Sequence, residues 1–339
     1  MHWPIDGANR SKKINRIETY FAYRLPHQSK VYYLKGKAQR VAELSNLPKD
    51  GIVINSFDSN QILIVTNLVE IDEADFDLSL NTDALLETTK FDYQNNFEQM
   101  HSALQKKEVE KVVLSRIKKI KTEKTGIEIF KSLNQNYAAT YNYILSNPEI
   151  GTWLGASPEL LLRVTADKIK TVSLAGTKQA NANTEWTEKE ITEQKIVTDF
   201  ILNTLKSNDF KNINSSSVQT VKAGTVEHLK TEISADVKNK EALHLLLIDL
   251  HPTPATCGLP KDIAFKRINE IEHHDRKFYT GFIGILRNGQ QDFFVNLRCM
   301  ELSVDEAVLY IGGGLTIDSH CESEWQETER KSTTLSNLL

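Results

Sequence analysis

The sequence predicts an α+β protein in which antiparallel hairpins alternate with helices. Two apolar segments, 282–286 and 292–298, flank the pair Asn288-Gly289, which readily takes the positive φ angles of a tight hairpin turn. Helical segments are interspersed with the strands, but few strand–helix–strand units of a doubly wound sheet occur. The 339 residues are 40% hydrophobic and 25% charged, and no Gly/Ser linker divides them. We therefore expect one compact globular domain.

The strands are predicted from runs of β-branched and apolar residues. They are 111–120, 140–145, 159–164, 169–174, 282–286, 292–298 and 307–311. The last of these strands runs directly into Gly312-Gly313-Gly314. Three consecutive glycines either bend the chain or let backbone amides approach an anion closely.

The helices are predicted from apolar residues that recur at helical spacing. Phe97, Met100 and Leu104 recur in this way and predict a helix within 92–108. Further helices are expected at 187–206, 241–250, 260–271 and 322–338.

Charge and cysteine content exclude several classes of protein. The net charge of −4 argues against a dedicated nucleic-acid surface, although it allows a small basic pocket for an anionic metabolite. No apolar run approaches the roughly 20 residues needed to span a bilayer, and the start lacks the pattern of a signal peptide. Three cysteines, Cys257, Cys299 and Cys321, follow no metal-ligand spacing. We therefore expect a cytoplasmic protein without disulfides or membrane contact.

Two Glu-x-x-Glu pairs lie on predicted helices. Glu190 and Glu193 form one pair, and Glu324 and Glu327 form the other. Residues so spaced share one helix face, and two such faces can meet over a hard divalent cation, most naturally Mg²⁺. The alternative is an ordinary solvated helix face. Glu190 also fits a capping box with Thr187, which weakens it as a ligand relative to Glu193.

Seven short segments together resemble the chorismate-utilising enzymes, and most of all their isochorismate synthase branch. They are Lys111–Arg116, Gly155–Leu161, Leu174–Thr177, His251–Ala255, Leu297–Cys299, Gly312–Gly314 and Glu324–Thr328, in this order. The resemblance covers 92–339 and leaves 1–90 as a variable N-terminal part of the same domain, 1–339. It implies two packed, largely antiparallel sheets flanked by helices.

The resemblance implies an acid and a base for isochorismate formation, in which water adds at C2 of chorismate and the C4 hydroxyl leaves. Lys111 matches the general base, and its pocket must favour the neutral amine for it to accept a proton. Glu159 matches the general acid, so we expect an apolar pocket that raises its pKa. From the sequence alone, a solvated lysine and a turn carboxylate are the alternatives.

The resemblance also implies a magnesium site and a substrate site. Glu193 and Glu327 match the Mg²⁺ ligands, with Glu190 and Glu324 behind them or bridged by water. Arg298 and Lys331 match the groups that hold the substrate carboxylates. The other implied substrate-binding residues are Gly176, Thr177, His228, Ala255, Tyr279, Gly312, Gly313 and Gly314. A lone histidine such as His228 is more often structural.

The branches of the family differ in nucleophile and in the step that follows. Anthranilate synthases generally lack a lysine at the position of Lys111, whereas aminodeoxychorismate synthase component I carries one. The segment His251-Pro-Thr-Pro-Ala255 is typical of isochorismate synthases, and salicylate synthases usually place threonine at Ala255. We therefore predict an Mg²⁺-dependent isochorismate synthase, a monomer without an obligate glutaminase subunit. Its product would suit a menaquinone, a catechol siderophore or a salicylate pathway equally.

Three alternatives remain. An aminodeoxychorismate synthase component I would use ammonia and a glutaminase partner, and a salicylate synthase would release pyruvate. A non-catalytic chorismate-binding protein would not need the acid and the base.

Overall fold

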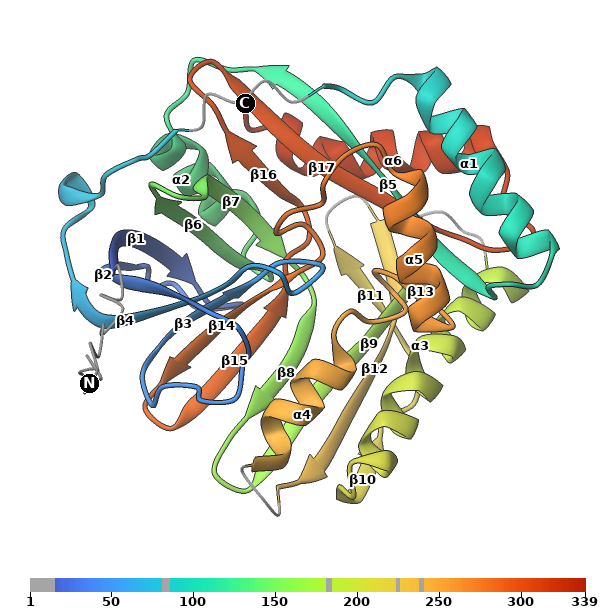
Figure 1. The fold of residues 1–339 in the computed structure, drawn as a ribbon, viewed down its shortest axis with the longest axis horizontal. Coiled ribbons are helices and arrows are strands. Elements are labelled where there is room, and N and C mark those ends of the chain that lie inside the picture. Colours follow the sequence, from blue (N-terminus) through green and yellow to red (C-terminus); the bar gives the residue numbers. More distant parts are fainter. Residues whose placement is uncertain (1–15, 81–85, 181–184, 224–225, 238–240) are drawn as a thin grey trace, which may run out of the picture.

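The computed structural model describes residues 16–80, 86–180, 185–223, 226–237 and 241–339 (Figure 1). The first residues, on which the absence of a signal peptide was predicted, lie outside this part. Every strand pairing of the described residues is antiparallel. Because six α-helices accompany these strands in the described part, the predicted α+β class is confirmed.

The strands in the first half of the chain are β1 (Ile17–Arg24), β2 (Tyr32–Val41), β3 (Gly51–Asn55), β4 (Ile62–Glu70), β5 (Lys111–Lys121), β6 (Tyr141–Asn147), β7 (Gly151–Ser157), β8 (Leu160–Val164) and β9 (Lys168–Gln179). Those in the second half are β10 (Lys211–Ser215), β11 (Gln219–Ala223), β12 (Val226–Asp236), β13 (Gly258–Leu259), β14 (Phe282–Arg287), β15 (Gln290–Val295), β16 (Cys299–Leu302) and β17 (Glu306–Leu315). The helices are η1 (Glu73–Asp75, a 3₁₀ helix), α1 (Lys90–Gln105), α2 (Gly126–Asn136), α3 (Glu188–Ser207), α4 (Glu241–Leu250), α5 (Lys261–Ile271) and α6 (Cys321–Ser336).

The strands surround an aromatic core, and the helices lie outside the strands (Figure 1). Phe21, Tyr143, Trp153 and Tyr310 belong to this core and are at most 1% exposed. Separate apolar clusters attach α3 and α4, α2 and α6, and α1 and α5 to the outer faces of the strands. Hydrogen bonds join all seventeen described strands into one sheet. The two expected layers are therefore parts of one continuous sheet that folds around the aromatic core.

The predicted hairpin at Asn288-Gly289 is confirmed. Arg287 pairs with Gln290 across a two-residue turn, and Asn288 and Gly289 have φ angles of 54° and 78°. Two positive φ angles match the twist of the flanking strands. The second strand begins and ends earlier than predicted, so Arg298 leaves the ladder with a φ angle of 47°.

The three consecutive glycines do not end their strand, which corrects the prediction of a strand over 307–311 alone. β17 continues to Leu315, and Gly312, Gly313 and Gly314 pair with Ser115, Leu114 and Val113 of β5. The backbone stays extended because β5 supplies a ladder partner along the whole segment. Absent side chains at these positions leave space on the sheet surface.

Two helices carry the predicted acidic pairs to the same region. α3 packs on β9, and α6 packs on β17. α3 begins at the predicted capping box of Thr187 and Glu190. No helix of the described residues is long and apolar enough to cross a membrane.

Candidate active site

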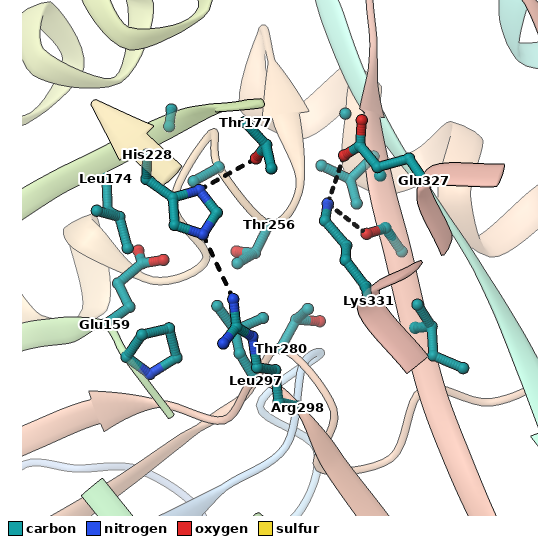
Figure 2. A pocket seen from close by; sticks show the side chains of 18 of the residues that line it. Glu159, Leu174, Thr177, His228, Thr256, Thr280, Leu297, Arg298, Glu327 and Lys331 are labelled. Carbon is teal, nitrogen blue, oxygen red and sulfur yellow. Dashed lines mark hydrogen bonds and ion pairs between the residues drawn. The ribbon is translucent and has the colours of Figure 1, made fainter. Parts of the chain in front are cut away.

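A cavity bounded by β9, β17 and α6 brings together most of the predicted site residues (Figure 2). The predicted residues that line it are Glu159, Gly176, Thr177, Glu193, His228, Ala255, Tyr279, Arg298, Gly312, Gly313, Gly314, Glu327 and Lys331. Lys111, Glu190 and Glu324 are described by the structure but do not belong to this lining.

His228 orients Arg298 on one side of the cavity (Figure 2). Its Nδ1 lies 3.2 Å from the carbonyl oxygen of Gly176 and 3.1 Å from Thr177 Oγ1. Because a carbonyl oxygen only accepts, we assign the imidazole proton to Nδ1. Nε2 can then accept from Arg298 Nη2 at 3.4 Å. Burial, together with the charges of Arg298 and Lys331, lowers the pKa of His228 to about 3, so the imidazole is neutral.

Arg298 and Lys331, the predicted carboxylate-binding pair, differ in how they are engaged. Burial lowers the pKa of the Arg298 guanidinium, and among the described residues no carboxylate forms an ion pair with it. Lys331 Nζ already contacts Glu327 Oε1 at 2.7 Å and donates to the carbonyl oxygen of Gly312 at 3.0 Å. Arg298 is thus the buried cation that is available to an anionic ligand.

Glu159 lies just before β8 and is 3% exposed. Figure 2 shows it beside Leu174, across the cavity from Glu327 and Lys331. Burial raises the pKa of Glu159 to about 8, although the charge of Lys111 acts in the opposite direction. The carboxyl group is therefore largely protonated at neutral pH, which is the environment that was predicted for it.

Lys111, the first residue of β5, is 0% exposed, so the alternative of a solvated lysine is wrong. Its Nζ lies 2.6 Å from Glu193 Oε1. A Cβ atom at Gly314 would come within 2.8 Å of both Glu193 Oε1 and Lys111 Cε. The absent side chain at Gly314 therefore makes room for this pair, of which Glu193 lines the cavity and Lys111 lies behind it.

Three carboxylates of the predicted metal site each contact a different lysine. Glu193 contacts Lys111, and Glu327 contacts Lys331. The third carboxylate is Glu324, which is 2% exposed. Its Oε1 accepts from Lys189 Nζ at 2.9 Å and from Ser319 Oγ at 2.7 Å, whereas its Oε2 is buried and has no hydrogen-bond partner in the described part of the chain.

The carboxylates suit a hard divalent cation in their chemistry. A Cβ atom at Gly313 would lie 3.4 Å from Glu324 Oε2 and 3.9 Å from Glu327 Oε1, so both groups face the glycine segment that Glu193 also approaches. The unpartnered Glu324 Oε2 is an available oxygen ligand. Within the described ranges, no three acidic, histidine or cysteine side chains are already grouped to hold a metal ion. Lysine ammonium groups hold these carboxylates instead.

Glu190 serves the start of its own helix. Its Oε2 accepts from the backbone N–H of Thr187 at 3.0 Å and from the Thr187 hydroxyl. The predicted capping box is therefore confirmed, while the ligand role of Glu190 stays a prediction. Gly176, with a φ angle of 72°, approaches the Glu190 backbone closely, since a Cβ atom there would lie 3.0 Å from the Glu190 carbonyl oxygen.

Several residues of the site were not predicted. Lys189 was missed, although it lies one turn before Glu193 on the same helix and its charge was a usable signal. The apolar and hydroxyl residues that complete the cavity wall are Val113, Pro158, Leu174, Ala175, Thr256, Thr280, Leu297, Leu309, Tyr310, Ile311, Ser332 and Leu335. Val113, Pro158, Leu174, Ala175 and Leu297 lie in segments that carry the family resemblance, whereas the side chains of the others carry no pattern that distinguishes them from core residues.

Comparison with known proteins defines the class to which this fold and cavity belong. Residues 58–339 match the family described as chorismate binding enzyme. Because this match covers more than half of the chain, the chain belongs to the chorismate binding enzyme family.

Individual relatives carry more specific names. The isochorismate synthase EntC of Escherichia coli (strain K12) is 31% identical over 246 residues, which cover 68% of this chain and 63% of that protein. The matched part of the chain thus spans less than two thirds of that relative's length.

Solved structures of two differently named synthases have the same fold as this chain. The menaquinone-specific isochorismate synthase MenF from Escherichia coli has a TM-score of 0.78 at 22% identity, covering 97% of this chain and 90% of that chain. Anthranilate synthase component I from Streptococcus pneumoniae TIGR4 has a TM-score of 0.68 at 17% identity, covering 99% and 95%. At these identities the likeness concerns the fold alone.

Proposed function

We propose that this chain is an isochorismate synthase. It adds water at C2 of chorismate, shifts the ring double bonds and releases the C4 hydroxyl as water. Membership of the chorismate binding enzyme family and the 31% identity to an isochorismate synthase support this proposal. The observation that carries it is Glu159, a carboxyl group with a pKa of about 8 on the wall of a cavity that also contains Arg298, whose guanidinium forms no ion pair with any described carboxylate.

Glu159 acts as the general acid. Expulsion of the C4 hydroxyl needs a proton, and a group that keeps its proton at neutral pH while remaining a moderate acid is suited to supply it. Its neighbours Pro158 and Leu174 keep this part of the cavity apolar.

Lys111 acts as the general base. Lys111 Nζ forms an ion pair with Glu193 Oε1 at 2.6 Å, which holds the side chain in place, and once deprotonated it accepts a proton from the water that attacks C2. One proton thus enters at Lys111 and one leaves from Glu159, so water is consumed and released in equal amounts.

Arg298 binds a substrate carboxylate. Chorismate carries two carboxylates, and a guanidinium fork suits a planar anion. His228 fixes the orientation of that fork from behind, because its neutral Nε2 accepts an N–H of Arg298. Lys331 provides a second cation on the cavity wall.

We further propose that Mg²⁺ is required and that Glu193, Glu324 and Glu327 hold it. When bound, Mg²⁺ supplies a positive centre that orients a substrate carboxylate. The unpartnered Oε2 of Glu324 supports this assignment.

The chain is also proposed to act as a cytoplasmic monomer without a glutaminase subunit. A single species near 38.5 kDa in light scattering of the purified chain, active alone, is the expected result. Dependence on a second subunit would contradict it.

Incubation with chorismate tests the proposed activity. The purified chain is mixed with chorismate and MgCl₂, with and without ammonium, and the products are resolved by chromatography and mass spectrometry. We expect a new species isobaric with chorismate that forms without ammonium and disappears with EDTA.

Other products would point to other branches of the family. An amino product that requires ammonium would identify an aminodeoxychorismate synthase component I, and salicylate with pyruvate would identify a salicylate synthase. Binding of chorismate without any product would identify a non-catalytic binding protein.

A further inference from the structure

A buried ion pair occupies the edge of β5 where a neighbouring strand would otherwise pair. β13 pairs with β5 only at Lys111 and Val112. After Val112, side chains instead of a strand form hydrogen bonds with the backbone of β5. Arg276 Nη2 donates to the carbonyl oxygen of Val113 at 2.8 Å, and Glu272 Oε1 accepts from the N–H of Ser115 at 2.7 Å. Two side chains thus satisfy backbone groups that a strand would normally satisfy.

The hydrogen bonds of this ion pair are saturated. Arg276 donates from Nε and Nη2 to both oxygens of Glu272, at 2.8 and 2.6 Å. Its Nη1 donates to the carbonyl oxygen of Thr256 at 2.9 Å and lies 3.5 Å from Thr280 Oγ1. Glu272 Oε2 also accepts from the Ser115 hydroxyl at 2.8 Å. With both side chains 2% exposed, such a fully satisfied network has one well-defined geometry.

The ion pair joins three segments that line the cavity. Val113 belongs to the strand of Lys111, Thr256 follows Ala255 in the 252–257 loop, and Thr280 follows Tyr279. The N–H of Val113 also donates to the carbonyl oxygen of Cys257 at 2.8 Å. The contacts of Arg276 with the carbonyl oxygens of Val113 and Thr256 therefore add a side-chain link to this direct bond between the loop and β5.

We propose that Glu272 and Arg276 are positioning residues that fix the 252–257 loop against β5 and thereby hold Lys111 in register with the opposite wall of the cavity. The effect of this positioning on the reaction rate rests on the proposed isochorismate synthase function. Neither residue lines the cavity, so both act through Val113, Ser115 and Thr256. The carboxylate-binding cations Arg298 and Lys331 lie on other segments, which separates substrate binding from the alignment that this pair controls.

Arg276→Lys tests the proposal because lysine keeps the charge but loses the planar fork that reaches two carbonyl oxygens at once. Arg24→Lys is the matched control. Arg24 is 3% exposed, as is Arg276, and it also donates to carbonyl oxygens, those of Gln28 and Ala138 at 3.0 and 2.9 Å. It lies on β1 and does not line the cavity.

Two readouts separate positioning from general stability. In hydrogen exchange, Arg276→Lys should accelerate exchange in both 111–116 and 252–258, whereas Arg24→Lys should leave both segments unchanged. In kinetics, Arg276→Lys should lower kcat by about 10- to 100-fold while KM for chorismate changes by less than about threefold. Arg24→Lys should keep kcat within about twofold of wild type at a similar loss of thermal stability.

The outcomes are distinguishable from failure of the proposed function. Unchanged exchange in 252–258, or equal kcat for the two variants, would overturn the positioning role. A wild-type chain that does not convert chorismate would overturn the activity, and the exchange measurement would still decide the role of the ion pair. Should Arg276→Lys not fold, Ser115→Ala removes a single hydroxyl from Glu272, and faster exchange in 111–116 is again the expected result.

Discussion

Glu159 is a carboxyl group that the fold keeps protonated, and this sets the upper pH limit of the proposed reaction. Its pKa is raised to about 8 by burial. We therefore predict that kcat/KM for chorismate falls above about pH 8, by roughly tenfold per pH unit, as the acid form is lost. Initial rates across the pH range check this, and a flat profile from pH 7 to 10 would contradict the assignment.

The same residue makes stability depend on pH in a defined direction. Because the folded state holds the Glu159 proton more tightly than the unfolded state, whose pKa is near 4.5, the contribution is complete below pH 4.5 and is lost as pH rises through about 8. Wild type should therefore lose stability relative to Glu159→Gln between pH 5 and 8 in denaturant titrations. The variant should also lose about 10²- to 10⁴-fold in kcat, since an amide does not donate the required proton.

Lys111 is the residue whose removal should separate catalysis from binding. Lys111→Ala is expected to lower kcat by about 10²- to 10⁴-fold while calorimetry still detects chorismate binding, because Arg298 is untouched. Lys119→Ala is the control, since Lys119 lies on the same strand and pairs with Glu306. Similar kcat values for Lys111→Ala and Lys119→Ala would contradict the assignment of Lys111 as the general base.

For single residues, the sequence predicted which side chains belong to the site better than it predicted their burial and their contacts. Lys111, Glu159 and Glu193 stood out through family motifs, but their burial and the Lys111–Glu193 contact depend on elements far apart in the chain. Lys189 was missed because a lysine on a charged helix looks solvated until α6 places Glu324 beside it.

The ion pair between Lys189 of α3 and Glu324 of α6 joins the two helices, and a bound metal would have to loosen it. Lys189→Met removes the ammonium from the buried Glu324 carboxylate, so metal-free protein should lose about 2 kcal/mol of stability, less than for a fully buried pair because Lys189 is partly exposed. The same variant should gain more thermal stability from MgCl₂ than wild type does, because a competitor for Glu324 is gone.

Two comparisons sharpen this test. Glu327→Gln should show the reverse behaviour, a smaller gain from MgCl₂ and a higher Mg²⁺ requirement in the activity assay. Equal MgCl₂ responses of wild type, Lys189→Met and Glu327→Gln would mean that Glu324 and Glu327 do not hold the metal.

The glycine segment of β17 makes room for the Lys111–Glu193 pair. Gly314→Ala places a Cβ atom 2.8 Å from Glu193 Oε1 and Lys111 Cε, whereas the nearest contact at Gly313 is 3.4 Å. Gly314→Ala should therefore lower kcat by about 10²-fold or more, and Gly313→Ala should cost clearly less. Steady-state kinetics on both variants measure this, and the reverse order would contradict the geometry.

Most features with a local signal were predicted, whereas features that depend on distant partners were not. The Asn288-Gly289 turn and the capping box of α3 are local, and both appear where expected. The continuation of β17 through three glycines requires β5 as a partner, which no local pattern reveals. Helix α2 was missed although its capping box, Thr125 with Glu128, gave a usable signal.

At the scale of the whole molecule, the N-terminal strands are part of the same hydrogen-bonded structure as the site. β1 pairs with β6, and β3 pairs with β14, so a segment without motifs completes the enclosure of the aromatic core. The alternation of predicted hairpins and helices predicted the α+β class. The layered arrangement came from the family resemblance, because strand order depends on contacts between distant segments.

The most direct test of the central claim is turnover of chorismate in H₂¹⁸O with MgCl₂ and without ammonium. We expect an isomer of chorismate that is about 2 Da heavier than the substrate, because the hydroxyl at C2 comes from water, and no such product from Glu159→Gln. An unlabelled isomer, a labelled isomer formed equally well by Glu159→Gln, or an absence of product would contradict it.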